Sequence, residues 1–502
     1  LEGTIGKGYS GDKNINVANL EGSERFGSGV SLNSAGDRLA VGAGGDEAAY
    51  LFSFSDTDFT GGNLDITFGN AFTDVENLDV ANLDFRDRFG SSVSLNGAGD
   101  RLAVGAARDD GIDNVGDNTG AVYLFSFSLP AGGLLSPSMA SFSENAGGNS
   151  EVLPADIETQ LNAGTDVTLQ ASNDITLKNE IVASNPDGDG GSLALQAGRS
   201  ILLDDDITTD NGNVSLIGNA TLTDGVVETD RDPGPAAITL AGSSTIDAGS
   251  GSVRIELRDG VDNTKGGSIE MQSNSRINTT GGDVELIASQ GISLNFGAAI
   301  KTGGGSIDII NNVDFDGTEF VFDSDGFPVS SGATGNFSGI VLSFATVDSG
   351  GGDIRLAGVG GTNLFQSQFF QVQNSGVIIF SESNIDTSGG NLSLAGVGGD
   401  QGFADGVAIV SDSNLSVGEG DLEIIARGGQ TSRGSSGFVL IDSSLSSDAK
   451  IDILAKSLAT SNFADGIFVS GTSTISQGAN GEGIDITGIG SKNVTAEVTD
   501  GD

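Results

Sequence analysis

Short apolar triplets alternate with small or polar residues along most of the chain from about residue 165 onward. The clearest triplets recur about every 30 residues, at 376–379, 406–409, 437–440 and 466–469. Two further short strands recur in step with them, at 391–394, 421–424 and 450–453, and at 384–386, 414–416, 444–446 and 474–476. Alternation with a period of two is typical of a strand with one buried face. Three such strands in each repeat indicate a solenoid.

A single coil of this kind cannot bury its own apolar face, so that face must lie against the next coil. The strands are separated by Gly-Gly, Asp-Gly and Asn-Gly pairs, which reach positive φ at little cost and let the chain turn a corner. Patterns with the helical period are nearly absent. The sequence therefore predicts an all-β fold whose residues 161–502 form a right-handed parallel β-helix (a β-solenoid). Residues that follow a Gly, Asn or Asp corner are expected at equivalent inward positions: Val167, Leu193, Val214, Val284, Ile307, Ile354, Leu392, Leu422 and Ile451.

Residues 1–128 hold a different repeat, in which residues 25–33 return as 88–96 and residues 35–43 return as 98–106. The second copy carries extra residues between Ala106 and Tyr123. Each copy is expected to form about four antiparallel strands, with the Gly-Asp pair turning a hairpin.

This repeat resembles the FG-GAP repeat of integrin-type β-propellers. The resemblance lies in the Phe-Gly pair, the Gly-Asp turn, the run Leu-Ala-Val-Gly-Ala and the aromatic strand that follows. It departs from the family at the end of that run. The family's Gly-Ala-Pro is replaced by Gly-Ala-Gly at 42–44 and by Gly-Ala-Ala at 105–107. Two blades do not close a propeller, which takes at least about four. We therefore expect further copies upstream, a small sandwich of the two blades, or packing against another subunit.

Residues 129–160 have the composition of a loop, and we expect a linker with a hydrophobic cap over the first coil, because an open solenoid end exposes unpaired strand edges. The runs at 164–177, 191–201, 211–217 and 282–288 resemble the haemagglutination-repeat region of filamentous-haemagglutinin-like bacterial exoproteins. That resemblance implies a secreted, rod-shaped surface protein or adhesin. The family's N-terminal secretion domain is not recognisable, and the chain begins with Leu1, so we expect a processed form or a fragment with a leader upstream.

Composition narrows the possible functions. The chain has 502 residues and a formal net charge of −47, from 69 acidic and 22 basic residues. Such a surface repels nucleic acid and anionic lipid and attracts cations. With no His and no Cys, the chain cannot use His-based catalysis or disulfide stabilisation. The chain has no apolar run of about 18 residues, so we expect no membrane insertion.

Acidic loops are the candidate metal sites, because calcium prefers carboxylate oxygens. One candidate is the insertion of the second repeat, where the FG-GAP resemblance implies a calcium loop although the motif Asp-x-Asp-x-Asp-Gly is not intact. The other is a pair of Asp-x-Asp-Gly segments in the longest insertion of the solenoid. The alternatives are a solvated acidic loop and ordinary turn chemistry. The predicted Ca²⁺ ligands are Asp109, Asp110, Asp113 and Asp117 in the first site, and Asp314, Asp316, Asp323 and Asp325 in the second.

An enzymatic function is also considered, since some β-helices cleave acidic polysaccharides with aspartates, calcium and an arginine. Arg254, Arg258 and Arg355 are candidates, but the net charge would repel a polyanionic substrate. The phenylalanines of the 363–380 stretch are expected to form a core stack rather than a sugar platform: Phe365, Phe369, Phe370 and Phe380.

We therefore expect a secreted, extracellular, non-enzymatic protein, either a surface adhesin or the subunit of a filament or matrix. The alternative is a glycan-binding or glycan-cleaving β-helix. The expected partners are cell-surface glycans or proteins and other copies of the chain. For self-association, the strand-like residues 493–498 would pair head to tail with the N-terminal blades of the next copy.

Overall fold

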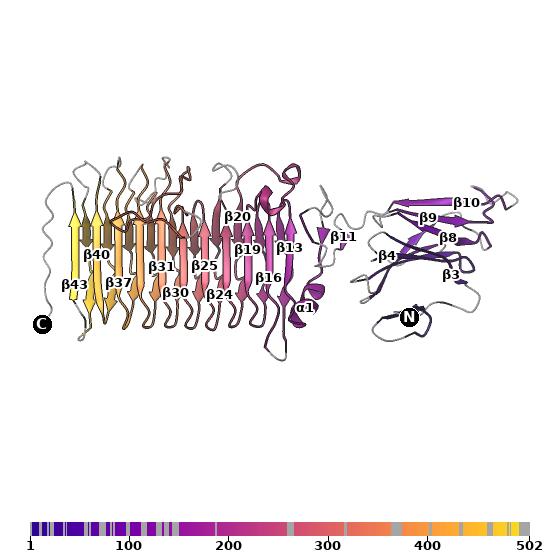
Figure 1. Ribbon diagram of the computed structural model, residues 1–502, viewed down its shortest axis with the longest axis horizontal. Coiled ribbons are helices and arrows are strands. Elements are labelled where there is room, and N and C mark those ends of the chain that lie inside the picture. The colour runs from indigo at the N-terminus through magenta and orange to yellow at the C-terminus, as the bar shows by residue number, and fades with distance from the viewer. Residues whose placement is uncertain are drawn as a thin grey trace. The chain divides into compact units, whose positions relative to one another are not determined.

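The computed structural model of the chain (Figure 1) divides into two compact units. The N-terminal unit comprises residues 1–136 and 148–151, and the solenoid unit comprises residues 137–147 and 152–502. The structure describes residues 3–490 except 10–12, 18–19, 21–24, 34–35, 37, 55–58, 60–61, 70–76, 81–82, 84–85, 97–100, 112–117, 127–132, 135–139, 143–149, 186–187, 259–265, 316–318, 363–373, 401–403, 431–434, 459–464, 479–480 and 482.

Three parallel sheets, in which each coil contributes one strand to each sheet, form the solenoid unit (Figure 1). Sheet I contains β13 (Val167–Ala171), β16 (Leu193–Ala197), β19 (Val214–Gly218), β22 (Val253–Leu257), β25 (Val284–Ala288), β28 (Ile307–Asn311), β31 (Ile354–Val359), β34 (Leu392–Val397), β37 (Leu422–Arg427), β40 (Lys450–Lys456) and β43 (Gly483–Ile489). Sheet II contains β14 (Ile175–Leu177), β17 (Ile201–Leu203), β20 (Ala237–Leu240), β23 (Ser268–Met271), β26 (Ile292–Asn295), β29 (Ile340–Ser343), β32 (Val377–Phe380), β35 (Val407–Val410), β38 (Phe438–Ile441) and β41 (Ile467–Ser470). Sheet III contains β15 (Ile181–Val182), β18 (Ile207–Thr208), β21 (Thr245–Asp247), β24 (Arg276–Asn278), β27 (Ala299–Lys301), β30 (Thr346–Asp348), β33 (Asn384–Asp386), β36 (Asn414–Ser416), β39 (Ser444–Ser447) and β42 (Thr474–Gln477).

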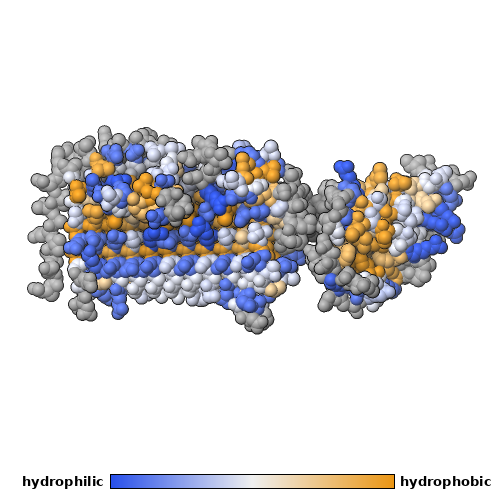
Figure 2. Space-filling model, viewed as in Figure 1, coloured by the Kyte–Doolittle hydropathy of each residue, from blue (hydrophilic) through white to orange (hydrophobic). Residues whose placement is uncertain are grey.

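The predicted inward positions form one continuous ladder at the start of the sheet I strands. Val167 pairs with Leu193, and the same register continues from coil to coil as far as Ile451. All nine predicted residues are buried, and Val253, which the prediction omitted, fills the one remaining place in the ladder. Rows of hydrophilic and hydrophobic residues therefore run along the solenoid as parallel stripes (Figure 2). The predicted all-β solenoid is confirmed.

Polar side chains hold successive coils together where the chain enters sheet I. Asp166 accepts a hydrogen bond from the backbone N–H of Ser192 in the next coil (2.8 Å). The same contact recurs along the solenoid. For example, the Asn391 side chain accepts a hydrogen bond from the backbone N–H of Asp421 in the next coil (2.9 Å). The Asn, Asp and Ser residues that mark corners in the sequence thus satisfy the backbone of the neighbouring coil.

Buried hydroxyl groups line the corner between sheets III and I. Thr302 donates a hydrogen bond to the carbonyl oxygen of Gly305 in its own turn (2.5 Å) and to that of Ser349 in the next coil (2.9 Å). Thr279 and Thr387 make the same pair of contacts. Burial of these hydroxyls therefore satisfies turn carbonyl groups that would otherwise lack a partner.

One helix, α1 (Pro154–Asn162), packs against β13 and β15 of the first coil. Proline at its first turn suits the helix start, where the missing N–H costs nothing. Its buried side chains are Ile157 and Leu161. The sequence predicted a linker with a hydrophobic cap over the first coil in this segment, and no helix. A nine-residue helix with two buried apolar residues shows too short a periodic pattern to be recognised.

The N-terminal unit is antiparallel in its main part. One sheet contains β3 (Phe26–Leu32), β4 (Arg38–Ala43), β5 (Ala48–Ser53), β6 (Asn63–Gly69) and β7 (Asn77–Asp79), in that order. A second sheet contains β8 (Phe89–Leu95), β9 (Arg101–Ala106) and β10 (Ala121–Ser126). Two small parallel pairs are formed by β1 (Thr4–Gly6) with β2 (Asn14–Asn16), and by β11 (Gly133–Leu134) with β12 (Ser150–Glu151).

The two predicted repeats are thus β3–β6 and β8–β10, and they pack face to face. Leu51 and Phe68 of the first repeat share one core cluster with Phe89, Leu102 and Val104 of the second. The first repeat has the expected four antiparallel strands, and the second has three among the described residues. The sequence left three arrangements of the blades open. The structure shows that the two blades pack against one another.

Candidate functional site

Most long connections of the solenoid gather at one corner, between sheets I and II. The chain spans residues 219–236, 258–267, 312–339 and 360–376 at this corner. At the corner between sheets II and III, by contrast, it turns within short segments such as 204–206 and 344–345. In a solenoid, insertions that map to one side often form the binding side. We therefore take the corner between sheets I and II as the candidate interaction surface.

The longest of these insertions, residues 312–339, folds back over the outer face of sheet I. Phe320 and Phe322 pack against a buried cluster that includes Ile310, Ala357 and Ala395 from three successive coils. Isolated β-bridges within the insertion join Val313 to Ser330, Phe315 to Phe320, and Phe322 to Pro328. The insertion is therefore a hydrophobic cover for this part of the sheet.

Arg427 of sheet I contacts two residues of the same insertion, Asp323 and Phe327. Its guanidinium group lies 2.9 Å from the carboxylate of Asp323 and 4.9 Å from the centre of the Phe327 ring. Asp323 also accepts hydrogen bonds from the backbone N–H groups of Asp325 and Phe327, both at 3.0 Å. This predicted calcium ligand thus forms an ion pair and closes a turn.

The other predicted ligands of the second site are described only in part. Asp314 accepts a hydrogen bond from the backbone N–H of Phe315 (3.1 Å), and Asp316 lies outside the described residues. A third acidic cluster, Asp204–Asp206, lies between β17 and β18, where the Asp206 carboxylate accepts a hydrogen bond from the backbone N–H of Thr245 (2.7 Å).

In the first predicted calcium site, Asp109 is a structural residue. The residue is 2% exposed, and its carboxylate accepts hydrogen bonds from the Tyr123 hydroxyl (2.6 Å) and the Gly111 N–H (2.8 Å). In the first repeat, Asp46 accepts a hydrogen bond from the Tyr50 hydroxyl (2.8 Å) in the same way. Burial and the contact with Asp109 raise the pKa of Tyr123, which keeps its hydroxyl a donor.

The remaining ligands of that site are only partly described. Asp110 accepts a hydrogen bond from the backbone N–H of Asn118 (2.6 Å), whereas Asp113 and Asp117 lie outside the described residues. In the described part of the chain, no three acidic side chains converge in a group that could hold a metal ion. Both calcium sites stay predictions, because Asp113, Asp117 and Asp316 lie outside the described residues.

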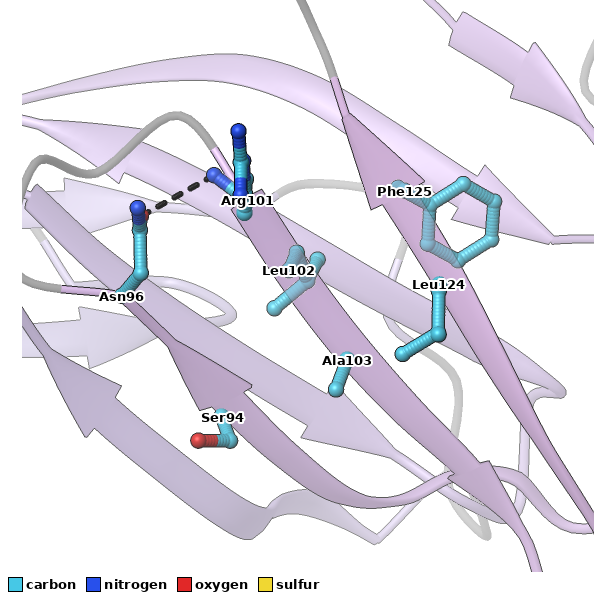
Figure 3. A pocket seen from close by; sticks show the side chains of 7 residues that line it. All are labelled: Ser94, Asn96, Arg101, Leu102, Ala103, Leu124 and Phe125. Atoms are coloured by element: carbon cyan, nitrogen blue, oxygen red, sulfur yellow. Dashed lines mark hydrogen bonds between the residues drawn. The ribbon is translucent and has the colours of Figure 1, made fainter.

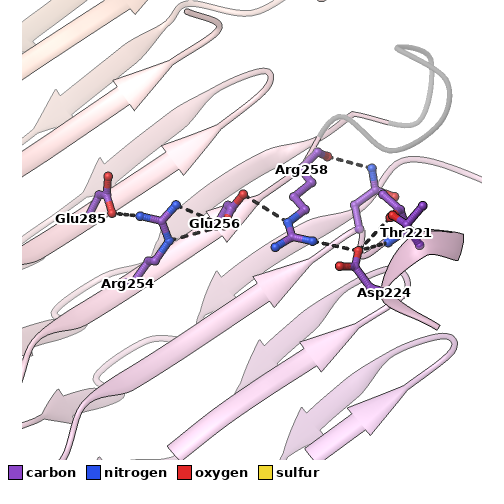
Figure 4. Close-up of polar contacts among 8 residues, drawn as sticks. Thr221, Asp224, Arg254, Glu256, Arg258 and Glu285 are labelled. Atoms are coloured by element: carbon purple, nitrogen blue, oxygen red, sulfur yellow. Dashed lines mark hydrogen bonds and ion pairs between the residues drawn. The ribbon is translucent and has the colours of Figure 1, made fainter. Parts of the chain in front are cut away.

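The arginines considered for catalysis are paired with carboxylates on the outer face of sheet I (Figure 4). Arg254 forms ion pairs with Glu256 (3.2 Å) and with Glu285 of the next coil. Arg258 lies 3.2 Å from Glu256 and 2.8 Å from Asp224. Asp224 ends the short helix η2 (Leu222–Asp224), so the row of charges attaches the insertion at 219–236 to the sheet.

The third such arginine is also paired, since Arg355 lies 3.0 Å from Asp308 of the preceding coil. Each of the three guanidinium groups therefore has a carboxylate partner within the fold. Their contacts tie neighbouring coils together.

Two phenylalanines stack on the surface at the corner between sheets II and III. The rings of Phe296 and Phe344 lie 5.3 Å apart, nearly parallel at 18°, and are 61% and 41% exposed. Both residues have positive φ, of 38° and 52°, which is unusual for a bulky side chain. This pair was not predicted from the sequence. Of the stack that it expected, Phe380 is partly buried in β32, and Phe365, Phe369 and Phe370 lie outside the described residues.

A buried carboxyl group was also missed. Asp405 is 7% exposed, and its side chain accepts a hydrogen bond from the backbone N–H of Ser436 (2.7 Å). Burial raises the pKa of Asp405 to about 7, since one hydrogen bond offsets only part of the cost of removing the charge from water. Nothing in the local sequence distinguishes Asp405 from the exposed acidic residues around it.

Comparison with known proteins supports one of the two family resemblances. Residues 78–125 match the family model described as FG-GAP repeat, which corresponds to the second repeat of the N-terminal unit. No curated protein and no solved structure matches the chain significantly. The family match therefore covers one blade. The solenoid is identified from its three parallel sheets alone. No helix among the described residues is long and apolar enough to span a membrane.

Proposed function

We propose that this chain is a non-enzymatic extracellular protein, which acts as an adhesin rod or as the subunit of an extracellular filament or matrix. The observation that carries the proposal is the uneven placement of its connections. A regular solenoid, whose inner positions are filled coil after coil, presents most of its long segments at one corner. Such a scaffold offers a long, repetitive surface for binding.

The charge and the arginine contacts agree with a binding role. The net charge of −47 opposes close approach of an acidic polysaccharide. The arginines that could neutralise such a substrate are already paired with Glu256, Asp224 and Asp308. FG-GAP repeats, which occur in extracellular and surface proteins, support placement outside the cell.

Two measurements test the proposal. Negative-stain microscopy of the purified chain should show rods or fibres. The same material should release no reducing ends from polygalacturonate or alginate. Polysaccharide cleavage that disappears in Arg254→Ala and persists in the control Arg276→Ala, whose guanidinium group belongs to sheet III, would overturn the non-enzymatic assignment.

A glycan-binding role is the second candidate, and the exposed pair of Phe296 and Phe344 favours it. Stacked rings offer an apolar surface, and their strained backbone is a feature often kept for function. The double variant Phe296→Ser/Phe344→Ser should then lose glycan binding by calorimetry. Retained binding in that variant, with loss in variants of the insertion at 312–339, would move the site to the corner between sheets I and II.

A further inference from the structure

Two exposed apolar surfaces lie outside the contacts described so far, and the first is on the second repeat. Val122 and Leu124 of β10 are 67% and 80% exposed. Beside them is a hollow of about 540 Å³ (Figure 3), which is lined by Leu124 and Phe125 of β10 and by Ser94, Leu102 and Ala103 of the two strands next to it.

The internal repeat accounts for this first surface. The counterparts of its two exposed residues in the first repeat are Ala49 and Leu51, since Tyr50 and Tyr123 each pair with the valine at the centre of the neighbouring strand. Ala49 and Leu51 are both 0% exposed and lie in the core cluster between the two repeats. The apolar residues around the hollow are thus the ordinary inner surface of a blade, and they point to no ligand.

The second surface is the stack of Phe296 and Phe344, which we call the aromatic pair, and no repeat accounts for it. Each ring belongs to the residue that directly follows a strand of sheet II. The same place is held in the next four coils by small residues, Ser381, Ser411, Asp442 and Gly471. The chain has positive φ at this place in every coil from β26 to β41, which a bulky side chain rarely adopts. Since serine serves the same turn in neighbouring coils, the turn does not require the two rings.

Three carboxylates continue the line of the aromatic pair along the solenoid. Glu382, Asp412 and Asp442, which we call the acidic row, are exposed and come from three successive coils. The backbone N–H of Glu382 donates to the Ser411 carbonyl (2.9 Å), and that of Asp412 donates to the Asp442 carbonyl (2.8 Å). The Asp442 carboxylate also accepts a hydrogen bond from the backbone N–H of Thr472 (2.8 Å). Neighbouring coils lie about 5 Å apart, so the three negative charges repel one another.

The acidic row has no cationic partner in the described part of the chain, where no lysine or arginine forms an ion pair with it. The outer face of sheet I differs, because its carboxylates are paired with arginines. Arg254 pairs with Glu285, and Arg355 pairs with Asp308. A cation from outside the fold would therefore relieve the repulsion within the acidic row.

The aromatic pair and the acidic row favour the same kind of ligand. The face of an aromatic ring attracts a positive charge, and a carboxylate binds a charged donor more strongly than a neutral one. The line from Phe296 to Asp442 runs over the coils of β26 to β38, a length of about 20 Å. That length suits an extended chain with several positive charges rather than a single ion.

We propose that this line binds a glycan built from amino sugars, whose ring faces pack on the aromatic pair and whose ammonium groups lie against the acidic row. The C–H faces of a pyranose ring are apolar and suit an aromatic surface. Ser381 and Ser411 lie between the aromatic pair and Asp442, and their hydroxyl groups can bind sugar hydroxyls. The inference rests on the glycan-binding candidate of the proposed function and names the class of its ligand.

The experiment measures binding by calorimetry with the full chain at about 100 µM, enough to detect a Kd in the micromolar range. The probes are oligomers of equal length of β-1,4-linked glucosamine, of N-acetylglucosamine and of galacturonate, at about pH 5, where amino groups carry a proton. The glucosamine oligomer should bind most tightly, the neutral N-acetylated oligomer more weakly, and the acidic oligomer should not bind. Sodium chloride should weaken the binding of the glucosamine oligomer more than that of the N-acetylated one.

Two double variants separate the two parts of the site. Phe296→Ser/Phe344→Ser introduces the residue that neighbouring coils carry at this place, and it should weaken the binding of both the glucosamine and the N-acetylated oligomer, the former at least about 5-fold. Glu382→Gln/Asp412→Asn should weaken binding of the glucosamine oligomer about 2- to 30-fold and leave the N-acetylated oligomer unchanged.

Matched controls carry the same changes at other places. Glu423→Gln/Asp452→Asn removes two carboxylates from successive coils of sheet I, and Phe315→Ser removes an exposed ring from the insertion at 312–339. Both controls should bind like the original chain. Unchanged circular dichroism and melting temperature of all variants separate a lost contact from a lost fold.

Several outcomes would overturn the inference. One is equal affinity for the charged and the neutral oligomer, and another is binding of the glucosamine oligomer that both double variants retain. An oligolysine that binds more tightly, and that loses its affinity in both double variants, would assign the line to a basic peptide instead. Neutral glycan binding that depends on the aromatic pair alone would refute only the amino-sugar ligand, whereas a chain that binds none of the oligomers would refute the glycan-binding candidate as well.

Discussion

In the solenoid unit, each strand of sheet I from β16 to β40 lies between two neighbours, and its inward side chains are covered on both sides. In the N-terminal unit, two repeats cover one another on one side each, and large apolar side chains such as Leu124 remain exposed. Both units are built from repeated strands, so the difference lies in how many neighbours each repeat has. Repeats that stack only on neighbours take their stability from those interfaces.

The largest expected effect concerns one position that is buried in the first repeat and exposed in the second. Leu51→Ala removes a side chain that is 0% exposed and should lower the free energy of unfolding by about 2–5 kcal/mol. Leu124→Ala at the equivalent, 80% exposed place should change it by less than about 0.5 kcal/mol in the monomer. Chemical denaturation of both variants measures the difference. Equal losses would show that the face of the second repeat is covered in solution.

The solenoid contains a buried carboxyl group that should make its stability depend on pH. The pKa of Asp405 is raised in the folded state from 3.8 to about 7, so the folded protein binds the proton more tightly than the unfolded chain. Its contribution to stability is fully present below pH 4 and is lost as the pH rises through 7. The loss is at most about 4 kcal/mol, at about 1.4 kcal/mol for each pKa unit.

Asp405→Asn tests this dependence, since asparagine has the same shape and no charge. The variant should match the original chain below pH 4 and should melt at a higher temperature above pH 7. Asp308→Asn is a control at a partly exposed carboxylate that is paired with Arg355. A variant that is less stable than the original chain at pH 8 would show that the Asp405 charge itself stabilises the fold.

A smaller effect is expected where hydroxyl groups join coils. Thr302→Val keeps the shape of the side chain and removes its hydrogen bonds to the Gly305 and Ser349 carbonyl groups. Leaving such a buried acceptor without its donor costs about 1–3 kcal/mol. Thr239→Val, at an outward position of β20, is the matched control. If both substitutions change the melting temperature equally, the corner hydroxyls do not hold the coils together.

The smallest effect concerns divalent ions. With a net charge of −47, millimolar calcium should raise the melting temperature slightly by reducing repulsion among carboxylates. Sodium chloride at matched ionic strength separates screening from binding. A calcium effect that vanishes in Asp110→Asn/Asp113→Asn would assign it to the acidic insertion, and an unchanged melting temperature in chelator would refute calcium stabilisation.

The sequence by itself determined the solenoid, because alternation is a local property. A residue such as Leu193 follows a corner and starts an apolar-polar alternation, so its burial can be read without knowing its neighbours. The two repeats of the N-terminal unit could be read in the same way from the return of residues 25–43. Helix α1 could not, since its two buried residues carry too little periodic signal.

Only the tertiary structure decided which surfaces are covered. The insertion at 312–339 was read from its acidic Asp-Gly segments alone, and only the structure shows that its Phe322 packs on sheet I and that its Asp323 pairs with Arg427. The exposure of Val122 and the burial of Ala49 also cannot be told from their local sequences, since the two residues occupy equivalent places in the two copies of the repeat, in β10 and β5. Burial of these residues depends on contacts between distant segments, and such contacts are set by how sheets pack rather than by the alternation within a strand.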